Sequence, residues 1–404
     1  MKIVIAGGGA AGFFTAVNVA EKNPQAQIHI YEKSSSVLGK VKVSGGGRCN
    51  VTHACFDPKE LAEHYPRGGT ELLGPFHKFQ PGDTMGWYED RGVELKIEDD
   101  NRVFPVSNSS ESIIHCLRES ARQADVQVHF KEGITNISKE ETGWKVTTSG
   151  RAEIAADVVV MTTGSSNQVW KMLEKLGHKV VEPVPSLFTF NCKDFRINEL
   201  AGVVAQNTDV KILGTKLESD GPLLITHWGF SAPAILKLSA WGARELADMG
   251  YKFELEVNWN NHFDFDSMVD KLKSLRQEEG KKKLSKLNPA ELPARLWDKL
   301  LNSVFSEEMP NWGDLPNKKI DELAETLCKC RFQINGKSTF KEEFVTAGGV
   351  ALEEVDFTTM ESKLYPGLYF AGEVLNIDAV TGGFNFQAAW TESWLISEAL
   401  TETE

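Results

Sequence analysis

The first stretch of the chain suited to chemistry combines glycines with an acid. Gly7-Gly8-Gly9-Ala10-Ala11-Gly12 reads G-x-G-x-x-G, and Glu32 follows about 20 residues after the last glycine. Such glycines permit a tight turn, a close approach of backbone to a pyrophosphate, and close packing of helix on strand. A carboxylate at Glu32 can accept hydrogen bonds from both ribose hydroxyls of an adenosine. The spacing predicts a dinucleotide site; the alternative is a glycine-rich turn in an ordinary α/β domain.

A second glycine stretch follows directly. Ser44-Gly45-Gly46-Gly47-Arg48-Cys49-Asn50 contains three consecutive glycines, which do not suit a helix or a packed strand. They predict a loop that lies flat against a ligand with its N–H groups free to bind. Arg48 and Lys40 can neutralise phosphate charge. The alternative is a flexible surface loop.

A third stretch lies near the C-terminus. Gly367 to Glu373 predicts a strand that ends in Ala-Gly-Glu, and Thr381-Gly382-Gly383-Phe384-Asn385-Phe386-Gln387 opens a helix that runs through Leu400. The free N–H groups of a helix N-terminus favour negative charge. The alternative for this stretch is an ordinary capped helix.

The elements around these stretches predict a parallel α/β domain. Lys2–Ala6 and Gln27–Tyr31 are short apolar strands on either side of a helix over Phe13–Glu21. The continuous apolar run Asp157–Met161 suits a buried parallel strand, and Thr163 and Gly164 follow it. Further predicted elements are a helix over Ser110–Gln123, strands at Val126–Phe130, Gly133–Ser138 and Trp144–Thr148, and a helix over Val169–Leu176.

The sequence pattern changes after Pro183-Val184-Pro185, which is the predicted boundary of the first domain. Short strands separated by turns predict a small β-barrel-like insert, which Arg331–Asn335 re-enters after a charged helical stretch. Asn288 is the expected cap, and Pro289 the first residue, of one of its helices. The predicted helices are Asp264–Glu278, Pro289–Phe305 and Lys318–Cys330. The predicted domains are 1–186 with 345–404, 187–262 with 331–344, and 263–330.

Composition narrows the class of protein. The 404 residues carry a net charge of −13, which argues against a nucleic-acid or membrane partner. The N-terminus does not read as a signal peptide, and no run of residues approaches the length of a membrane span. The six scattered cysteines predict reduced thiols in a cytoplasmic protein and no metal site. The oligomeric state stays open.

The glycine stretches together resemble a bacterial flavoprotein family. Its members are usually labelled aminoacetone oxidase family FAD-binding enzymes, and a bile-acid-modifying flavoprotein is similar to them. The resemblance covers nearly the whole chain and implies non-covalent FAD, bound by a Rossmann-like domain of the two-dinucleotide-binding flavoprotein type. It also implies the inserted β-barrel-like domain and the helical subdomain. Beyond the three stretches, it rests on Asn101–Pro105, Thr226–Pro233, Thr346–Val350 and Thr359–Gln387.

The resemblance also implies roles for individual residues. The backbone of Ile134 is expected near the adenine, and Glu373 and Asp378 are expected at the ribityl chain and the pyrophosphate, in either order. The helix start at Gly382-Gly383 would direct N–H groups at the flavin pyrimidine, where negative charge gathers on reduction. The predicted FAD contacts are Gly7, Gly9, Ala10, Ala11, Gly12, Glu32, Lys33, Lys40, Ser44, Gly45, Gly46, Gly47, Arg48, Cys49, Asn50, Ile134, Thr163, Gly164, Gly372, Glu373, Asp378, Gly382, Gly383, Phe384, Asn385 and Gln387.

Some positions depart from the family pattern or carry two interpretations. After Thr163-Gly164 the family's glycine-rich stretch is missing or shortened, which changes this edge of the cofactor cleft. His227 lies in a stretch similar to the family's T-H-x-G-x-S motif, and is either an acid/base over the isoalloxazine or a structural histidine. Trp228 and Ala232 depart from the family's usual small or basic residue and glycine, which would narrow the pocket. Cys49 is either a redox thiol or a structural one.

The predicted function is an FAD-dependent oxidoreductase of a small organic substrate, with hydride transfer at flavin N5. It is either an NAD(P)H-dependent reductase or an oxidase of an amine or another substrate. No second G-x-G-x-x-G lies between Val158 and Val345, so NAD(P)H would bind transiently as electron donor. Two alternatives remain: a flavin-bound binding protein linked to RNA modification or assembly, and NAD in place of FAD.

Overall fold

The computed structural model describes residues 1–305, 309–338 and 345–401. The chain divides into two compact units: unit 1 comprises residues 1–184 and 341–404, and unit 2 comprises residues 185–340. The barrel and the predicted helical subdomain 263–330 both lie in unit 2. Residues 339–344 and 402–404 of the predicted domains lie outside the described part of the chain.

Unit 1 is built on a sheet whose central strands are parallel. The motif strand β1 pairs with β10 on one side and β2 on the other, and both pairings are parallel and in continuous register. Every residue of β10 is buried, as its apolar run predicts. The order of the seven strands is β19 (Val355–Asp356), β20 (Glu361–Ser362), β21 (Leu368–Phe370), β10 (Val158–Met161), β1 (Lys2–Ala6), β2 (Gln27–Glu32) and β6 (Gln127–Phe130).

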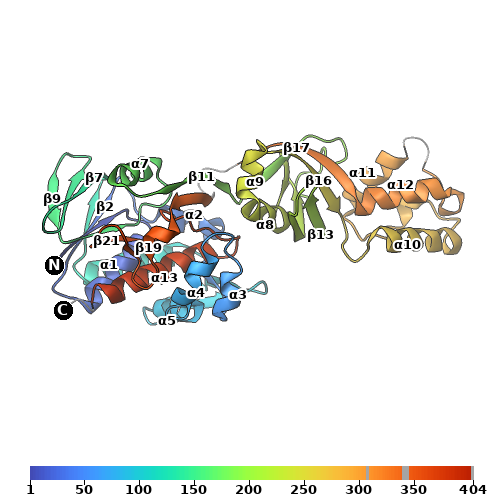
Figure 1. Cartoon of the computed structure of the whole chain (residues 1–404). Helices are drawn as coiled ribbons and strands as arrows, with labels where there is room; N and C mark the ends of the chain where they lie inside the picture. The colour runs from blue at the N-terminus through green and yellow to red at the C-terminus, as the bar shows by residue number, and fades with distance from the viewer. Residues whose placement is uncertain (306–308, 339–344, 402–404) are drawn as a thin grey trace. The chain divides into compact units, whose positions relative to one another are not determined.

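Two long helices pack together beside this sheet. α1 (Ala10–Lys22) lies alongside α13 (Phe384–Ala399), although they come from opposite ends of the chain (Figure 1). α13 has buried residues on nearly every face, including polar ones. The other helices of unit 1 are α2 (Gly39–Gly47), α3 (Pro58–Ala62), α4 (Gly69–Phe76), α5 (Pro81–Glu89), α6 (Glu111–Gln123), α7 (Asn167–Leu176) and the 3₁₀ helix η3 (Leu352–Glu354).

Smaller sheets complete unit 1. β3 begins just after the second glycine stretch and pairs with β5. The three sheets are β3 (Thr52–His53), β5 (Arg102–Pro105) and β4 (Leu95–Ile97); β7 (Ile134–Lys139), β8 (Trp144–Thr148) and β9 (Glu153–Ala156); and β11 (Val180–Ser186) with β18 (Val345–Val350).

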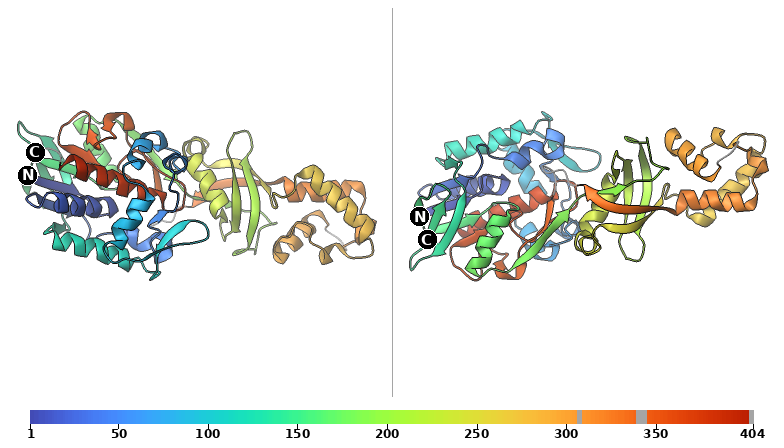
Figure 2. Two further views of the ribbon diagram at one scale, coloured as in Figure 1. Left: turned by 90° about the horizontal axis from the view of Figure 1, so that it is seen from below. Right: turned by 90° about the horizontal axis from the view of Figure 1, so that it is seen from above.

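Unit 2 contains a closed barrel, which confirms the β-barrel-like insert. Its strands in order are β12 (Thr189–Cys192), β15 (Gly229–Ser231), β14 (Glu218–Ile225), β13 (Val204–Ile212), β16 (Lys252–Asn258) and β17 (Cys330–Ser338). Its helices are α8 (Pro233–Trp241), α9 (Ala243–Asp248), α10 (Phe265–Glu278), α11 (Ala294–Val304) and α12 (Asn317–Cys328), with 3₁₀ helices η1 (Leu284–Lys286) and η2 (Trp312–Asp314). Figure 2 shows α10 to α12, coloured gold to orange, gathered at one end of the barrel. One hydrophobic cluster includes both barrel and helix residues, so the two share a core.

Two helix predictions in unit 2 were wrong at their ends. The helix expected from Pro289 begins at Ala294, because Pro293 has no N–H to donate and disfavours a helical conformation at the residue before it. The side chain of Asn288 instead closes a turn, in which its amide bonds both backbone groups of Leu292. The helix expected to end at Cys330 ends at Cys328, and Cys330 begins β17.

The second glycine stretch differs in part from the predicted loop. A helical turn begins at Gly39, and the backbone leaves helical geometry at Ser44. Gly45, Gly46 and Gly47 then have φ of 56°, 68° and 84°, in the left-handed region that favours glycine. The glycines therefore form a left-handed turn at the end of a short helix. No helix among the described residues is long and apolar enough to cross a membrane.

Candidate cofactor site

The glycines of the first motif divide into two kinds. Gly7 has φ of 110°, and a Cβ there would lie 2.5 Å from the carbonyl oxygen of Thr162, at the end of β10. A Cβ on Gly12 would collide with the carbonyl oxygen of Gly7. A Cβ on Gly9, by contrast, would meet no atom of the described chain within 4 Å. The strand and helix packing requires Gly7 and Gly12, whereas Gly9 leaves its backbone open to a ligand at the N-terminus of α1.

The predicted ribose acid is held against the same motif. Glu32 Oε2 accepts a hydrogen bond from the Gly8 N–H at 2.8 Å, and Oε1 accepts one from the Ser34 N–H at 2.8 Å. Gly133, the residue before the predicted adenine contact Ile134, lies so close to Lys33 that its Cβ would be 2.8 Å from the Cβ of Lys33. The structure thus brings Glu32, Lys33 and Ile134 together at the carboxyl end of β2.

The second glycine stretch meets the start of α13. A Cβ on Gly383 would lie 2.5 Å from the carbonyl oxygen of Thr52 and 2.9 Å from Oδ1 of Asn50. A Cβ on Gly45 would lie 2.9 Å from the Asn50 N atom. Asn50 is 8 % exposed, and its buried Oδ1 has no hydrogen-bond partner among the described residues. An acceptor without a donor therefore sits beside a helix N-terminus that has donors to offer.

Together these segments form one site, which we call the glycine cradle: Gly7–Gly12, Gly45–Asn50 and Gly382–Gly383. Two neighbouring segments also contact the first motif: the Leu38 N–H donates to the Gly8 carbonyl at 2.9 Å, and a Cβ on Gly372 would lie 3.4 Å from the Cβ of Ala11. Gly164 follows β10 with φ of 61°, and its Cα faces open space next to Thr163.

The basic residues predicted to neutralise phosphate are paired with protein carboxylates. Lys40 Nζ lies 2.5 Å from Oε2 of Glu373, an ion pair that links α2 to the segment after β21. Arg48 Nη1 lies 2.6 Å from Oε1 of Glu98, and its guanidinium lies over the ring of Phe104 at 3.8 Å. Ser44 Oγ donates to the carbonyl of Val41.

Three of the predicted contact side chains bond within the protein. The fully buried carboxylate of Asp378 pairs with the Arg67 guanidinium through two hydrogen bonds. Asn385 bonds both backbone groups of Ala379, and buried Gln387 Oε1 accepts from Thr52 Oγ1 at 2.6 Å. These side chains hold the backbone of the cradle in place.

Cys49, within the cradle, and Glu392, beside it, are both buried. Burial raises the pKa of the Cys49 thiol to about 12, so the thiol stays protonated, as a structural cysteine would. Burial also raises the pKa of Glu392, on α13, to about 8. One oxygen of Glu392 accepts the Gly372 N–H at 2.5 Å, and the other has no partner in the described chain.

The structure also reveals a ring cluster that the sequence did not suggest. Phe384 stacks on His53 at 4.5 Å between centroids and on His64 at 4.2 Å, and Tyr65 Oη donates to the Phe384 carbonyl at 2.6 Å. His53 comes from β3, directly after the second glycine stretch, where the alternation of a strand sends Thr52 and His53 to opposite faces. That alternation can be read from the sequence. It does not predict the ring cluster, because the rings that His53 contacts come from distant segments.

His227 lies in unit 2, in the turn between β14 and β15, and its side chain is exposed. The turn is closed by Thr226, whose Oγ1 accepts hydrogen bonds from the N–H groups of Trp228 and Gly229. Its acid/base role stays a prediction. Ala232 nearby has φ of 79°, a conformation that favours glycine.

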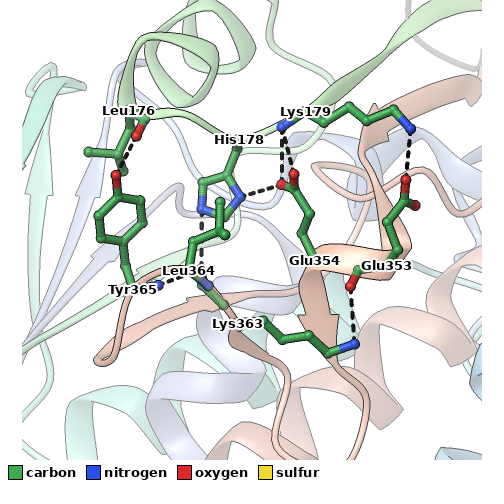
Figure 3. A network of polar contacts seen from close by, with 9 residues as sticks. Leu176, His178, Lys179, Glu353, Glu354, Lys363, Leu364 and Tyr365 are labelled. Carbon is green, nitrogen blue, oxygen red and sulfur yellow. Dashed lines mark hydrogen bonds and ion pairs between the residues drawn. The ribbon is translucent and has the colours of Figure 1, made fainter.

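A serine–histidine–carboxylate arrangement, absent from the sequence prediction, occurs elsewhere in unit 1. His178 Nδ1 lies 2.7 Å from Glu354 Oε2, and its Nε2 lies 3.2 Å from Ser362 Oγ (Figure 3). We call these three residues the His178 cluster. The side chain of His178 is fully buried, and Ser362 Oγ also accepts the N–H groups of Leu364 and Tyr365. The serine is therefore not placed as a nucleophile. No group of metal-ligating side chains occurs in the described residues.

A family model described as the HI0933-like protein Rossmann domain matches residues 1–399. The chain belongs to this family. It is a family of FAD-dependent oxidoreductases, and unit 1 has the Rossmann-type FAD-binding fold. The chain is 25 % identical to "Ribosomal RNA dihydrouridine synthase" of Escherichia coli, over 98 % of this chain and 97 % of that protein. It is also 25 % identical to "3-dehydro-bile acid delta(4,6)-reductase" of Clostridium scindens, over 99 % of each chain.

Solved structures agree on the fold. The 3-ketosteroid-Δ4-(5α)-dehydrogenase of Rhodococcus jostii matches with a TM-score of 0.53 and 12 % identity, over 99 % of this chain and 96 % of that one. The 3-ketosteroid Δ1-dehydrogenase of Sterolibacterium denitrificans matches with a TM-score of 0.52 and 12 % identity, over 100 % and 99 %. The predicted flavoprotein fold is confirmed. Aminoacetone oxidase activity does not appear in the names of these relatives.

Proposed function

We propose that this protein binds FAD non-covalently in the glycine cradle and reduces a carbon–carbon double bond conjugated to a carbonyl group in a small organic molecule, with NAD(P)H as electron donor. The observation that carries the FAD assignment is the unpartnered, buried Oδ1 of Asn50 beside the N-terminus of α13. An imide edge presents an N–H between two carbonyl groups, and the pyrimidine ring of a flavin has such an edge. Asn50 would accept from the N–H, and backbone N–H groups at the helix start would donate to a carbonyl.

The rest of the cradle fits the other parts of FAD. The open backbone at Gly9, at the N-terminus of α1, suits the pyrophosphate. Glu32, beside Lys33 and Ile134, suits the adenosine ribose. FAD would supply hydride transfer at its N5 atom. Of the two acids expected at the ribityl chain and the pyrophosphate in either order, we propose Glu373 for the ribityl chain, because the carboxylate of Asp378 is enclosed by Arg67.

The relatives' names support the choice of a reductase. A dihydrouridine synthase and a bile-acid delta(4,6)-reductase both have names that imply addition of hydrogen to a double bond. In uracil and in a 4,6-dien-3-one, that double bond is conjugated to a carbonyl group. We favour a small molecule over RNA because the chain carries a net charge of −13, which opposes a polyanion. The six free cysteines support a reducing, cytoplasmic location.

The decisive experiment is the visible spectrum of the purified protein, followed by anaerobic addition of NADPH and then NADH. The proposal expects a flavin spectrum that bleaches within seconds, and reoxidation by an electron-poor alkene such as a conjugated enone. A colourless protein would contradict FAD binding. A flavin untouched by both nucleotides but bleached by an amine would instead support the oxidase alternative, of which aminoacetone oxidation is one form. Reoxidation by ribosomal RNA alone would contradict the small-molecule assignment.

A further inference from the structure

His53 is an ionisable side chain that lies against both Gly382 and the first residue of α13. Its Cδ2 is 3.4 Å from the position that a Cβ on Gly382 would occupy, and its ring stacks on Phe384, the first residue of the helix. It is three residues from Asn50, on the strand that packs against Gly383. Any ring bound at the Asn50 acceptor and this helix start therefore lies near His53.

The nitrogen atoms of the His53 ring are in different environments. Nδ1 is buried and has no hydrogen-bond partner within the described residues. The ring also hydrogen-bonds the backbone of Asp100, an interaction that favours the protonated form. A nitrogen without a partner is the one that can accept a proton, and the charge that it gains spreads over the ring. The imidazole whose Cδ2 edge faces the cradle therefore has an unused basic site.

Burial and the neighbouring positive charges favour the neutral form of the His53 imidazole. Burial lowers the pKa of His53 below its ordinary value, and so do His64, from the segment after α3, and Arg102, from β5. The charge and backbone of Asp100 act in the opposite direction, while α13 contributes the uncharged ring of Phe384. A negative charge created within a few ångströms would raise the pKa of the imidazole and draw a proton onto it.

We propose that His53 takes up a proton when FAD bound in the glycine cradle is reduced, so that its imidazolium compensates the negative charge on the reduced flavin pyrimidine. This inference rests on the proposed function. In the balanced step, a hydride passes from NAD(P)H to the flavin, NAD(P)⁺ leaves, and one proton from solvent binds His53. Two electrons and two protons enter the protein, and one of the protons resides on His53.

The test measures the midpoint potential of the bound flavin between pH 6 and 8 against reference dyes, for the wild type and for H53N, H53Q and H64N. The wild type is expected to take up two protons for two electrons, with an anionic reduced-flavin spectrum. In H53N and H53Q the slope of potential against pH is expected to halve, to one proton. H64N is expected to keep the two-proton slope, which separates His53 from the neighbouring imidazole.

The outcomes distinguish this inference from the proposed function. A wild-type protein without a flavin spectrum would refute the function itself. A flavin-containing wild type that takes up only one proton would overturn the role of His53 even if no variant folds. An unchanged slope in H53N or H53Q, or a halved slope in H64N alone, would overturn it as well.

Discussion

Two polar regions of unit 1, the His178 cluster and the glycine cradle, are built from the same kinds of group: imidazole, carboxylate and backbone N–H. In the His178 cluster every group has a partner: both Glu354 oxygens accept the Lys179 N–H, and both His178 nitrogens are hydrogen-bonded (Figure 3). In and beside the cradle, Asn50 Oδ1, His53 Nδ1 and Glu392 Oε1 are buried without a partner among the residues that the structure describes.

This difference distinguishes a region that stabilises the fold from a region that can bind a ligand. Buried polar groups normally find partners, because each unsatisfied group costs about 1–3 kcal/mol. A closed network such as the His178 cluster therefore stabilises the fold and has nothing left to bind a ligand. Unsatisfied groups gathered around open glycine backbone indicate a region whose partners come from a bound molecule.

The largest effect is expected from the two kinds of glycine in the first motif. G12A places a methyl group against the Gly7 carbonyl, and should destabilise the protein by about 3 kcal/mol and abolish FAD binding. G9A meets no protein atom, so it should leave stability within about 0.5 kcal/mol and weaken FAD binding about tenfold. Thermal unfolding and flavin titration measure both. Equal losses of stability in the two variants would contradict the distinction between Gly12, which is packed against the protein, and Gly9, which is not.

H178A tests the His178 cluster, in which every polar group has a partner. It leaves the Glu354 carboxylate and Ser362 without their imidazole partner in the interior, and should reduce the free energy of unfolding by about 3 kcal/mol. The matched control is H77A, since the His77 side chain is exposed. Folded H178A should keep the flavin absorption spectrum and affinity. A specific loss of flavin at full stability would contradict a purely structural role.

E32A tests the acid that is held against the glycine cradle. Glu32 should accept the ribose hydroxyls, so its loss should weaken FAD binding by about 2 kcal/mol, which is roughly 30-fold. E141A, at an exposed position, is the control. Flavin retention on gel filtration and a direct titration measure the change. Unchanged occupancy in E32A would remove Glu32 from the site.

The smallest effect concerns the buried carboxyl beside the cradle. Because burial raises the pKa of Glu392 to about 8 in the folded protein, the folded state holds a proton that the unfolded state loses above its ordinary pKa. Stability should therefore fall as pH rises, by about 1.4 kcal/mol between pH 6 and 7. E392Q, which cannot titrate, should lack this component in denaturant unfolding at the two pH values. An identical pH slope in E392Q would exclude Glu392 as its source.

The sequence alone determined the central elements and the type of fold, but it predicted none of the helices α3 to α5, α8 and α9. The strand, glycine turn, helix and acid pattern around Gly7–Gly12 and Glu32, the buried strand before Thr163, and the barrel strands are all local signals. They depend on residue period and on the conformational freedom of glycine, which neighbouring residues in the chain specify. For that reason β1 matches its predicted range, and β2 and β10 each differ from theirs by one residue at one end. The helix α1 begins three residues before its predicted start.

Only the tertiary structure decided which groups meet. Gly383 packs against Thr52 and Asn50 because α13 returns to the start of the chain, and the same packing places Phe384 on His53. It also encloses the predicted ligand Asp378 with Arg67 and assembles His178 with Glu354. Such contacts join segments far apart in the chain, so no local period reports them. Whether a polar side chain ends up satisfied or open to a ligand is settled by this packing alone.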